Sequence, residues 1–547
     1  MKYWIARLGF ATFVALTTSG AFASAYYLSD CQPGASSECV AGSNSTGAGT
    51  AAKPWQTTTK LPALRPGDTV SFAKGGAWMF ASSWSPAFGT RGSPITYTSY
   101  QGAWCTGGAC ATSKPRLTAP ANTRLLDLSN SGSPVHKEGL VINGLELRAT
   151  PGSTSNVSVG VFVYNDSDWI TLDNLTISGF AIGVQLAGSN PVSSGSTSDG
   201  INQNIAIRNS DIHDNTSMGI LGSAVDLLVE NNRFDNNGGY NVYDHNLYLS
   251  GSAARPALRM TIRGNTSTRS GTGGNGNCHS AHFVFHGVLD QLTIENNVID
   301  SSSGADPSCY GIAVDNGYTS AEIFTNVIVR GNTVANVGNV GIGLDTCQAC
   351  TIENNVIVWN GAAAQSMVGI AVPGATANGS GGTGDAIQEA IVVRNNSIYI
   401  ASGGSGARGI RLDTYGEDHQ LVSNLVYFGV GAASGHACFS PGALSMFALF
   451  DNNLCYDASS SGRWSADYAT LGAAQRAGYD MHGSNANPLL ATVPSVANGY
   501  SMALKPTSPA IGAGGRVLSV DPDIGAWQHV GVVKAVPPSA PAGVVIQ

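Results

Sequence analysis

One short phrase, built around an asparagine, returns ten times along the chain. Clear copies lie at residues 230–234, 263–266, 295–299, 330–334, 353–357 and 394–398, and weaker copies centre on Asn174, Asn209, Asn424 and Asn453. The steps between the ten asparagines are 35, 23, 33, 32, 35, 23, 41, 28 and 29 residues. A unit of this length, made of short Val- and Ile-rich stretches broken by Gly, Asn, Ser and Asp, is typical of a β-strand repeat architecture.

Stacked repeats also explain how a chain of 547 residues avoids the size limit of a single compact core, because each unit contacts only its neighbours. Parallel strands about 4.8 Å apart would place equivalent asparagines in a column. Asparagines in such a column can hydrogen-bond along the stack. We therefore expect a structural role for them.

A second motif, Gly-Ile-x-Leu or a close variant, accompanies the asparagine phrase. It occurs at residues 182–186, 310–315, 340–345, 368–372 and 408–413. Strand alternation predicts that Ile and Leu point inward and that the residues between them point outward.

The two ends of the chain differ from the repeats. Residues 1–25 have a basic start, an apolar stretch and an Ala23-Ser24-Ala25 cleavage signal, which predicts a secreted or periplasmic protein. We expect an N-terminal cap at 26–115, β-helix repeats at 116–464, a C-terminal closing segment at 465–530 and a Pro/Ala-rich tail at 531–547.

All ten cysteines lie after the predicted cleavage site, and an even number in an oxidising compartment predicts disulfides. Suitable pairs are Cys31/Cys39, Cys105/Cys110, Cys347/Cys350, Cys278/Cys309 and Cys438/Cys455. The spacing of Cys347 and Cys350 also fits a redox motif, but that motif belongs at the start of a helix.

The net charge of −8 and the pI near 5.6 argue against nucleic acid and anionic membrane surfaces as partners. After the signal segment, no apolar run is long enough to cross a membrane. We expect a monomer.

The asparagine phrases, the Gly-Ile-x-Leu stretches, the cap segment 65–72 and the segment 508–514 together resemble secreted right-handed parallel β-helix proteins of the pectate-lyase-like superfamily. The resemblance covers nearly the whole chain after the signal segment. It implies an all-β solenoid with capping segments and a polysaccharide partner. Because this fold hosts lyases, hydrolases, epimerases and adhesins, it does not by itself define the activity.

Alignment of the Gly-Ile-x-Leu strands predicts outward columns that carry the chemistry. The last column reads Ser250, His286, Asp315, Asp345, Pro373 and Asp413. Asp315 and Asp345 would lie about 5 Å apart on adjacent turns, where two like charges need a cation or a shared proton. They could bind Ca²⁺, act as the carboxyl pair of a glycosidase, or merely mark the ends of turns.

Proton abstraction beside a uronate carboxylate needs a base, and pectate-lyase relatives use Lys or Arg. No lysine lies between Lys137 and Lys505, which excludes a lysine base inside the repeats. Arg411 remains a candidate base, with a salt bridge to Asp413 or Asp345 as the structural alternative.

Histidines offer a second route for the proton, because their ordinary pKa is near 6.5. His245, His282 and His286 fall on neighbouring turns with Tyr248 close by, and a Tyr/His pair could act as acid and base. His282 and His286 cannot share one ion, because residues four apart on a strand are about 13 Å apart. Tyr310 is a candidate for stacking on sugar.

These patterns predict a polysaccharide lyase as first choice. Asp315 and Asp345 would bind Ca²⁺, and Asp345 with Arg411, or His286 with Tyr248, would carry the catalysis. His245, His282, Asp413 and Tyr310 would contact the glycan. The alternatives are a glycoside hydrolase that uses Asp315, Asp345 and Asp413, and a non-catalytic glycan-binding protein.

Overall fold

The computed structural model describes residues 23–130, 136–152, 155–188, 199–252, 255, 257–273, 276–361, 367–373, 385–403, 406–413, 415–432, 434–515 and 522–528. Most of the predicted signal segment and all of the predicted tail at 531–547 lie outside these residues.

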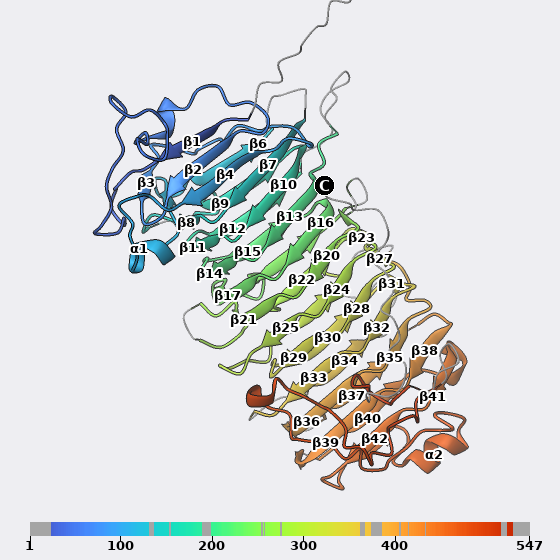
Figure 1. Ribbon diagram of the computed structural model, residues 1–547. Coiled ribbons are helices and arrows are strands. Elements are labelled where there is room, and N and C mark those ends of the chain that lie inside the picture. The colour runs from blue at the N-terminus through green and yellow to red at the C-terminus, as the bar shows by residue number, and fades with distance from the viewer. Residues whose placement is uncertain are drawn as a thin grey trace, which may run out of the picture.

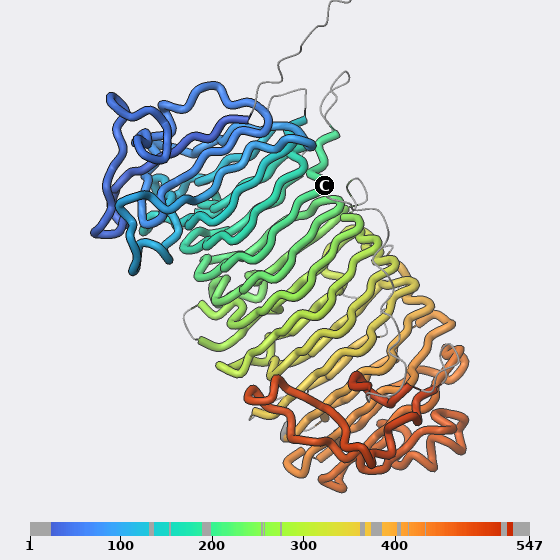
Figure 2. The backbone as a smooth tube through the Cα atoms, in the orientation of Figure 1, coloured from blue at the N-terminus to red at the C-terminus, as the bar shows by residue number. Residues whose placement is uncertain are grey.

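The chain folds as a right-handed parallel β-helix, which confirms the predicted all-β solenoid (Figure 1). Three long sheets, called S1, S2 and S3 here, have 14, 13 and 12 strands, and a short sheet, S4, has four. Figure 2 shows how the chain winds through them turn after turn.

The strands of S1 are β1 (Ala25–Leu28), β2 (Thr69–Ala73), β4 (Ile95–Tyr100), β7 (Lys137–Asn143), β10 (Ser167–Asp173), β13 (Gln203–Arg208), β16 (Val225–Glu230), β20 (Thr261–Arg263), β24 (Thr293–Glu295), β28 (Ile328–Arg330), β32 (Thr351–Glu353), β35 (Val392–Arg394), β38 (His419–Val422) and β41 (Phe447–Asp451). Those of S2 are β3 (Ala77–Met79), β5 (Arg116–Thr118), β8 (Glu146–Arg148), β11 (Thr176–Ser178), β14 (Asp211–His213), β17 (Arg233–Asn237), β21 (Thr266–Ser270), β25 (Val298–Asp300), β29 (Thr333–Ala335), β33 (Val356–Trp359), β36 (Ser397–Gly403), β39 (Leu425–Ala432) and β42 (Leu454–Asp457).

The strands of S3 are β6 (Arg124–Ser129), β9 (Val159–Tyr164), β12 (Ile182–Ala187), β15 (Met218–Gly222), β18 (Leu247–Ser250), β22 (Phe283–His286), β26 (Ile312–Val314), β30 (Val340–Leu344), β34 (Val368–Val372), β37 (Arg408–Leu412), β40 (Ala437–Pro441) and β43 (Arg463–Ser465). Those of S4 are β19 (Ala257–Leu258), β23 (Val288–Asp290), β27 (Ile323–Thr325) and β31 (Cys347–Gln348). The helices are α1 (Ala109–Thr112) and α2 (Leu471–Arg476), with 3₁₀ turns at Thr58–Lys60, Leu444–Met446 and Val496–Asn498.

A ladder of buried asparagines follows the bend between S1 and S2, as predicted. The Nδ2 of Asn297, for example, donates to Asn332 Oδ1 on the next turn at 2.9 Å and to the Ile262 carbonyl at 2.9 Å. The ladder consists of Asn232, Asn265, Asn297, Asn332, Asn355, Asn396, Asn424 and Asn453. These amides satisfy backbone groups that the bend would otherwise leave unpaired in the core.

The residue before each ladder asparagine adopts the left-handed conformation that Asn and Gly tolerate best, with φ of 56° at Asn296 and 64° at Gly331. Our alignment of the first two copies was wrong by one residue. Asn174 and Asn209 occupy this left-handed position, and Ser210 takes the place in the ladder.

The glycines of the Gly-Ile-x-Leu strands point toward the interior. A Cβ added to Gly341 would lie 2.6 Å from the Gly369 carbonyl oxygen and 2.8 Å from a methyl carbon of Ile357. Gly and the Ile after it are thus both inward at a corner, so strict alternation begins only after them.

The five predicted disulfides all form: Cys31–Cys39, Cys105–Cys110, Cys278–Cys309, Cys347–Cys350 and Cys438–Cys455. This number of disulfides is typical of proteins that fold outside the cytosol. Within the described part of the chain, no helix is long and apolar enough to span a membrane.

The two ends of the solenoid are covered differently. The first strands of S1 and S2 already lie inside the predicted N-terminal cap, before S3 begins at β6. At the other end, Trp464 and Tyr479 pack on Phe450. The chain then returns along S2, where the hydroxyl of Tyr500 donates to Asp300 Oδ2 at 2.8 Å.

Candidate functional site

The register of S3 confirms how the predicted alignment pairs residues on adjacent turns. Ser250 pairs with His286, Ala313 with Gly343, and Ala371 with Arg411. Val314 pairs with Leu344, so Asp315 and Asp345 directly follow paired residues on adjacent turns. The backbone thus brings the two carboxylates to the same edge of S3, at the ends of β26 and β30.

Both carboxyl groups have strongly perturbed pKa values. Burial raises the pKa of Asp315 to about 7, and the nearby Glu322 adds to the effect. Burial also raises the pKa of Asp345 to about 7, and the neighbouring Asp315 contributes, while Arg411 acts in the opposite direction. A pair whose members titrate close to neutrality can hold one proton between them, which is a common property of acid–base sites.

A buried glutamate shapes the loop that follows Asp315. Glu322 is fully buried, and its carboxylate accepts hydrogen bonds from the backbone N–H groups of Gly287, Gly317 and Tyr318 at 2.5–2.8 Å. The Glu322 N–H in turn donates to Asp385 Oδ1 at 2.8 Å. These bonds tie the loop to the strand before it and hold Tyr318 near the carboxyl pair.

Asp385 completes this clamp, because its Oδ2 accepts from Asn316 Nδ2 at 3.0 Å. Sequence reasoning missed Glu322 and Asp385. They lie in loops of unequal length, where no column of equivalent residues exists. Their only signal is an acidic side chain near the end of a loop that returns to the sheets.

His286 lies against Asp315. Its Nδ1 is 2.5 Å from the Asp315 carbonyl oxygen and 3.5 Å from Asp315 Oδ1. Burial lowers the pKa of His286, so the ring is neutral at pH 7 and can act as a base. The rings of Tyr248 and Tyr318 lie 5.4 Å and 5.3 Å from it.

The hydroxyls of Tyr248 and Tyr318 are 2.5 Å apart, so one of them donates to the other. Burial, followed by this contact, raises the pKa of Tyr248 far above its ordinary value. A phenol in this state keeps its proton at neutral pH, so it can donate a hydrogen bond but is a weak acid and a poor base.

Arg411 forms an ion pair with Asp413, which was the structural alternative for this residue. Its Nε lies 2.9 Å and 2.8 Å from the two oxygens of Asp413. Both side chains are about one-third to two-fifths exposed, so the pair is accessible to a ligand. The negative charge of Asp413 therefore largely balances the positive charge of the Arg411 guanidinium.

The prediction that His282 faces outward to contact the glycan is wrong. The side chain is fully buried, and its two ring nitrogens contact the hydroxyls of Ser267 and Ser301 at 2.9 Å and 2.8 Å. Burial lowers its pKa to about 3. The cause is the corner geometry described above, because His282 occupies the inward position that Gly311 holds on the next turn.

His245 is also buried, with Nδ1 3.0 Å from the Ala281 carbonyl oxygen and its ring stacked on Tyr248 at 5.6 Å. Burial lowers its pKa to about 4. Tyr310 is half-buried over Ala313, beside the groups described above.

Three buried oxygens close to the acid pair accept no hydrogen bond from any described residue. They are Asp315 Oδ1, Thr346 Oγ1 and Gln388 Oε1. Gln388 Nε2 donates to Asp345 Oδ1 at 3.3 Å, which puts its amide beside the pair. Carboxylate and amide oxygens are ligands that Ca²⁺ prefers, so the chemistry of Asp315, Asp345 and Gln388 suits this ion.

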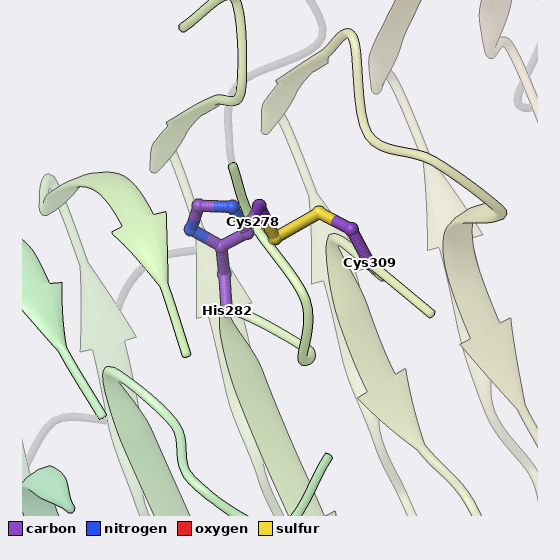
Figure 3. A group of neighbouring side chains, drawn as sticks. All are labelled: Cys278, His282 and Cys309. Atoms are coloured by element: carbon purple, nitrogen blue, oxygen red, sulfur yellow. A yellow bond between two sulfur atoms is a disulfide. The ribbon is translucent and has the colours of Figure 1, made fainter. Parts of the chain in front are cut away.

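A second cluster, Cys278, His282 and Cys309, has the donor types and the proximity of a metal site, but the two sulfurs are bonded to each other (Figure 3). A disulfide supplies no thiolate ligands. With Cys278–Cys309 formed, this cluster is part of the core.

Comparisons with known proteins agree with the fold. A family model described as "Right handed beta helix region" matches residues 154–328, and no curated protein matches the chain. The Dettilon tailspike protein (gp208) is similar at 14% identity over 73% of this chain and 64% of its own length, with a TM-score of 0.41.

Two further solved structures have other activities in their names. Pectate lyase Pel9A is 12% identical over 92% of this chain and 97% of its own, with a TM-score of 0.36. The catalytic domain of the GH87 alpha-1,3-glucanase is 13% identical over 72% of this chain and 65% of its own, with a TM-score of 0.46. One fold can serve unrelated activities, so the activity of this chain has to be argued from its own residues.

Proposed function

We propose that the protein is a polysaccharide-cleaving enzyme and that Asp315 and Asp345 are its catalytic carboxyl pair. The observation that carries the proposal is the register of S3, which brings the two carboxyl groups to the same edge on adjacent turns, where burial raises the pKa of both. Glycoside hydrolysis needs one protonated and one ionised carboxyl group at the same pH. A pair that titrates near 7 supplies this combination.

The site favours hydrolysis over the β-elimination that we predicted first. Elimination needs a cation to neutralise the uronate carboxylate and a base to remove the α-proton. Arg411 is already paired with Asp413, so its charge is not free to neutralise a uronate, although His286 could serve as the base. Glu322 also acts on Asp315 through its negative charge, which repels a uronate but not a neutral glycan.

In the hydrolytic mechanism, the protonated member of the pair donates its proton to the glycosidic oxygen. The ionised member activates water or attacks the sugar carbon. The Arg411–Asp413 pair offers donors and acceptors to sugar hydroxyls, and Tyr310 offers a ring face for stacking.

Ca²⁺-assisted elimination is the second candidate, and the unpaired oxygens of Asp315 and Gln388 favour it. Asp315, Asp345 and Gln388 would hold the ion, which would supply the positive charge that a uronate carboxylate needs. His286, neutral and beside Asp315, would then be the base in place of Arg411.

The test is a screen against neutral and acidic polysaccharides that records reducing ends and ultraviolet absorbance together, with and without EDTA. New reducing ends without absorbance, unaffected by EDTA, are the expected result. Absorbance that EDTA removes would replace hydrolysis by the second candidate.

Asp345→Asn should abolish turnover in either mechanism. Asp290→Asn is the matched control, because Asp290 lies on S4 and accepts from Gln291, Asn326 and Thr325, none of which belongs to the proposed site. Full turnover by Asp345→Asn would remove the site assignment.

A further inference from the structure

The asparagine ladder ends on an aspartate. Asp480 lies 27 residues after Asn453, and its Oδ1 accepts from the backbone N–H of Asn453 at 3.0 Å and from Asn453 Nδ2 at 3.3 Å. Asn453 Oδ1 accepts the same two bonds from Asn424, both at 3.0 Å. Asp480 therefore takes the place of one further rung. It follows α2, at the end of the solenoid that is drawn in orange in Figure 1.

A rung of this ladder needs a donor as well as an acceptor. Asn453 Nδ2 also donates to the Leu421 carbonyl oxygen at 2.9 Å. Strand register pairs Leu421 with Phe450, so the Phe450 carbonyl, which accepts from the Asp480 N–H at 3.1 Å, is the equivalent acceptor for position 480. An ionised carboxylate only accepts hydrogen bonds, whereas a protonated one also has an O–H to donate. Asp480 can thus replace an asparagine in full only when it carries a proton.

The surroundings of the Asp480 side chain disfavour a negative charge. The residue is fully buried, and its Oδ2 accepts no hydrogen bond of normal geometry from any described residue. The charged groups beside it are Asp451 of β41, which repels an ionised Asp480, and His482, which is exposed and bonds Asp451 at 2.6 Å. Burial raises the pKa of Asp480 to about 7, and the hydrogen bonds from Asn453 and, more weakly, the indole of Trp464 only partly oppose this rise.

The segment that contains Asp480 closes the end of the core. Trp464 and Tyr479 pack on Phe450. The carbonyl oxygen of Asp480 accepts from the Gly483 N–H at 2.9 Å. A Cβ added to Gly483 would lie 2.3 Å from Asp480 Oδ2, so the chain folds over the carboxyl and leaves no room for another group there.

We propose that Asp480 makes this segment, residues 464–483, a pH-sensitive latch at the end of the solenoid. With its proton, Asp480 completes the ladder and holds the latch on the core. Without the proton, a buried charge that lacks a cation favours an open state, in which water reaches the carboxylate. The latch lies on other turns than Asp315 and Asp345 and is independent of the proposed hydrolysis.

The direction of the pH effect follows from the two states of the latch. Once the latch is open, Asp480 has the ordinary aspartate pKa of about 3.9. This lies below the pKa of the closed state, so the closed latch binds a proton that the open latch has lost. Opening should therefore become easier as the pH rises from about 4 to about 7, and no easier beyond that. Since each unit of pKa difference is a tenfold change in the equilibrium, the total increase should be about a hundredfold or more.

Hydrogen exchange with mass spectrometry on the full-length protein measures the opening. The readout is the protection factor between about pH 5 and pH 8, because this quantity removes the intrinsic effect of pH on exchange. Peptides that cover residues 471–483 should lose protection by about a hundredfold over this range. Asp480→Asn supplies the amide of an ordinary rung at every pH, so its protection should stay high and nearly constant.

His482→Gln is the matched control. The hydrogen bond to Asp451 raises the pKa of His482, so loss of that proton at higher pH would loosen the same segment in the same direction. The variant removes this second titrating group and leaves Asp480 in place. Its latch should therefore lose protection with rising pH as the parent protein does.

Several results would overturn the proposal. One is protection at residues 471–483 that does not change with pH in the parent protein. Another is an Asp480→Asn protein that loses protection as the parent does, or that fails to fold, since position 480 would then not accept the amide of a rung. A pH dependence that disappears in His482→Gln would assign the effect to the His482–Asp451 pair instead.

Discussion

Removal of one asparagine from the ladder should destabilise the protein by an amount that the structure predicts. In Asn332→Ala, the backbone N–H of Asn297 loses its acceptor, Asn332 Oδ1, at 3.0 Å. One N–H of the Asn297 side chain loses the same acceptor at 2.9 Å. Both donors are fully buried, so water cannot replace the lost oxygen without a rearrangement.

Each buried donor left unpaired costs about 1–3 kcal/mol, so the free energy of unfolding should fall by about 2–6 kcal/mol. Equilibrium urea unfolding measures this loss. Hydrogen exchange at the Asn297 amide gives an independent readout, because that N–H should exchange much faster than in the parent protein.

Asn326→Gly is the matched control. Asn326 has a left-handed φ of 54°, which glycine tolerates, and its exposed side chain donates only to Asp290 Oδ1. Its substitution should change the unfolding free energy by less than about 0.5 kcal/mol. A loss below about 1 kcal/mol in Asn332→Ala would refute the reasoning, because it would mean that the bend satisfies its backbone groups without the ladder.

Three further predictions follow from the site and the disulfides. Because Asp315 and Asp345 have pKa values raised to about 7, the folded protein holds protons that the unfolded chain releases above about pH 4. The stability measured by thermal unfolding should therefore decrease from pH 4 to pH 7.5. The decrease should be less steep in Asp345→Asn, which has one of these two groups fewer. Since Arg411 opposes the rise in the pKa of Asp345, Arg411→Met should raise that pKa further and move the alkaline limit of activity to higher pH. An unchanged pH–rate profile would contradict this coupling. The denatured protein should show no reactive thiol before reduction and ten afterwards, and any thiol found before reduction would disprove at least one disulfide.

Most of the fold could be predicted from sequence because one residue type repeats for one physical reason. The asparagine phrase marks a bend at which the same backbone groups need hydrogen-bond partners on every turn. The left-handed residue before it and the inward glycine of S3 are equally local requirements. The error at Asn174 and Asn209 arose because the phrase contains two positions that favour asparagine, and only one of them forms the ladder.

The candidate site was predictable only in part. The column that contains Asp315 and Asp345 follows from strand register. Aligning the repeats of this chain with one another was therefore enough to predict that the two residues lie on adjacent turns. His282 was misplaced because alternation does not hold at the corner before the strand. Glu322 and Asp385 could not be found at all, since they act from loops whose contacts are set by tertiary structure and not by a repeat.

The chemistry of bond cleavage tests the central claim most directly, and mass spectrometry of products formed in heavy-oxygen water measures it. Hydrolysis by the Asp315–Asp345 pair predicts that each cleaved bond gains one heavy oxygen atom, with no unsaturated sugar and no product from Asp345→Asn. Unsaturated products without the heavy atom, or normal cleavage by Asp345→Asn, would contradict it.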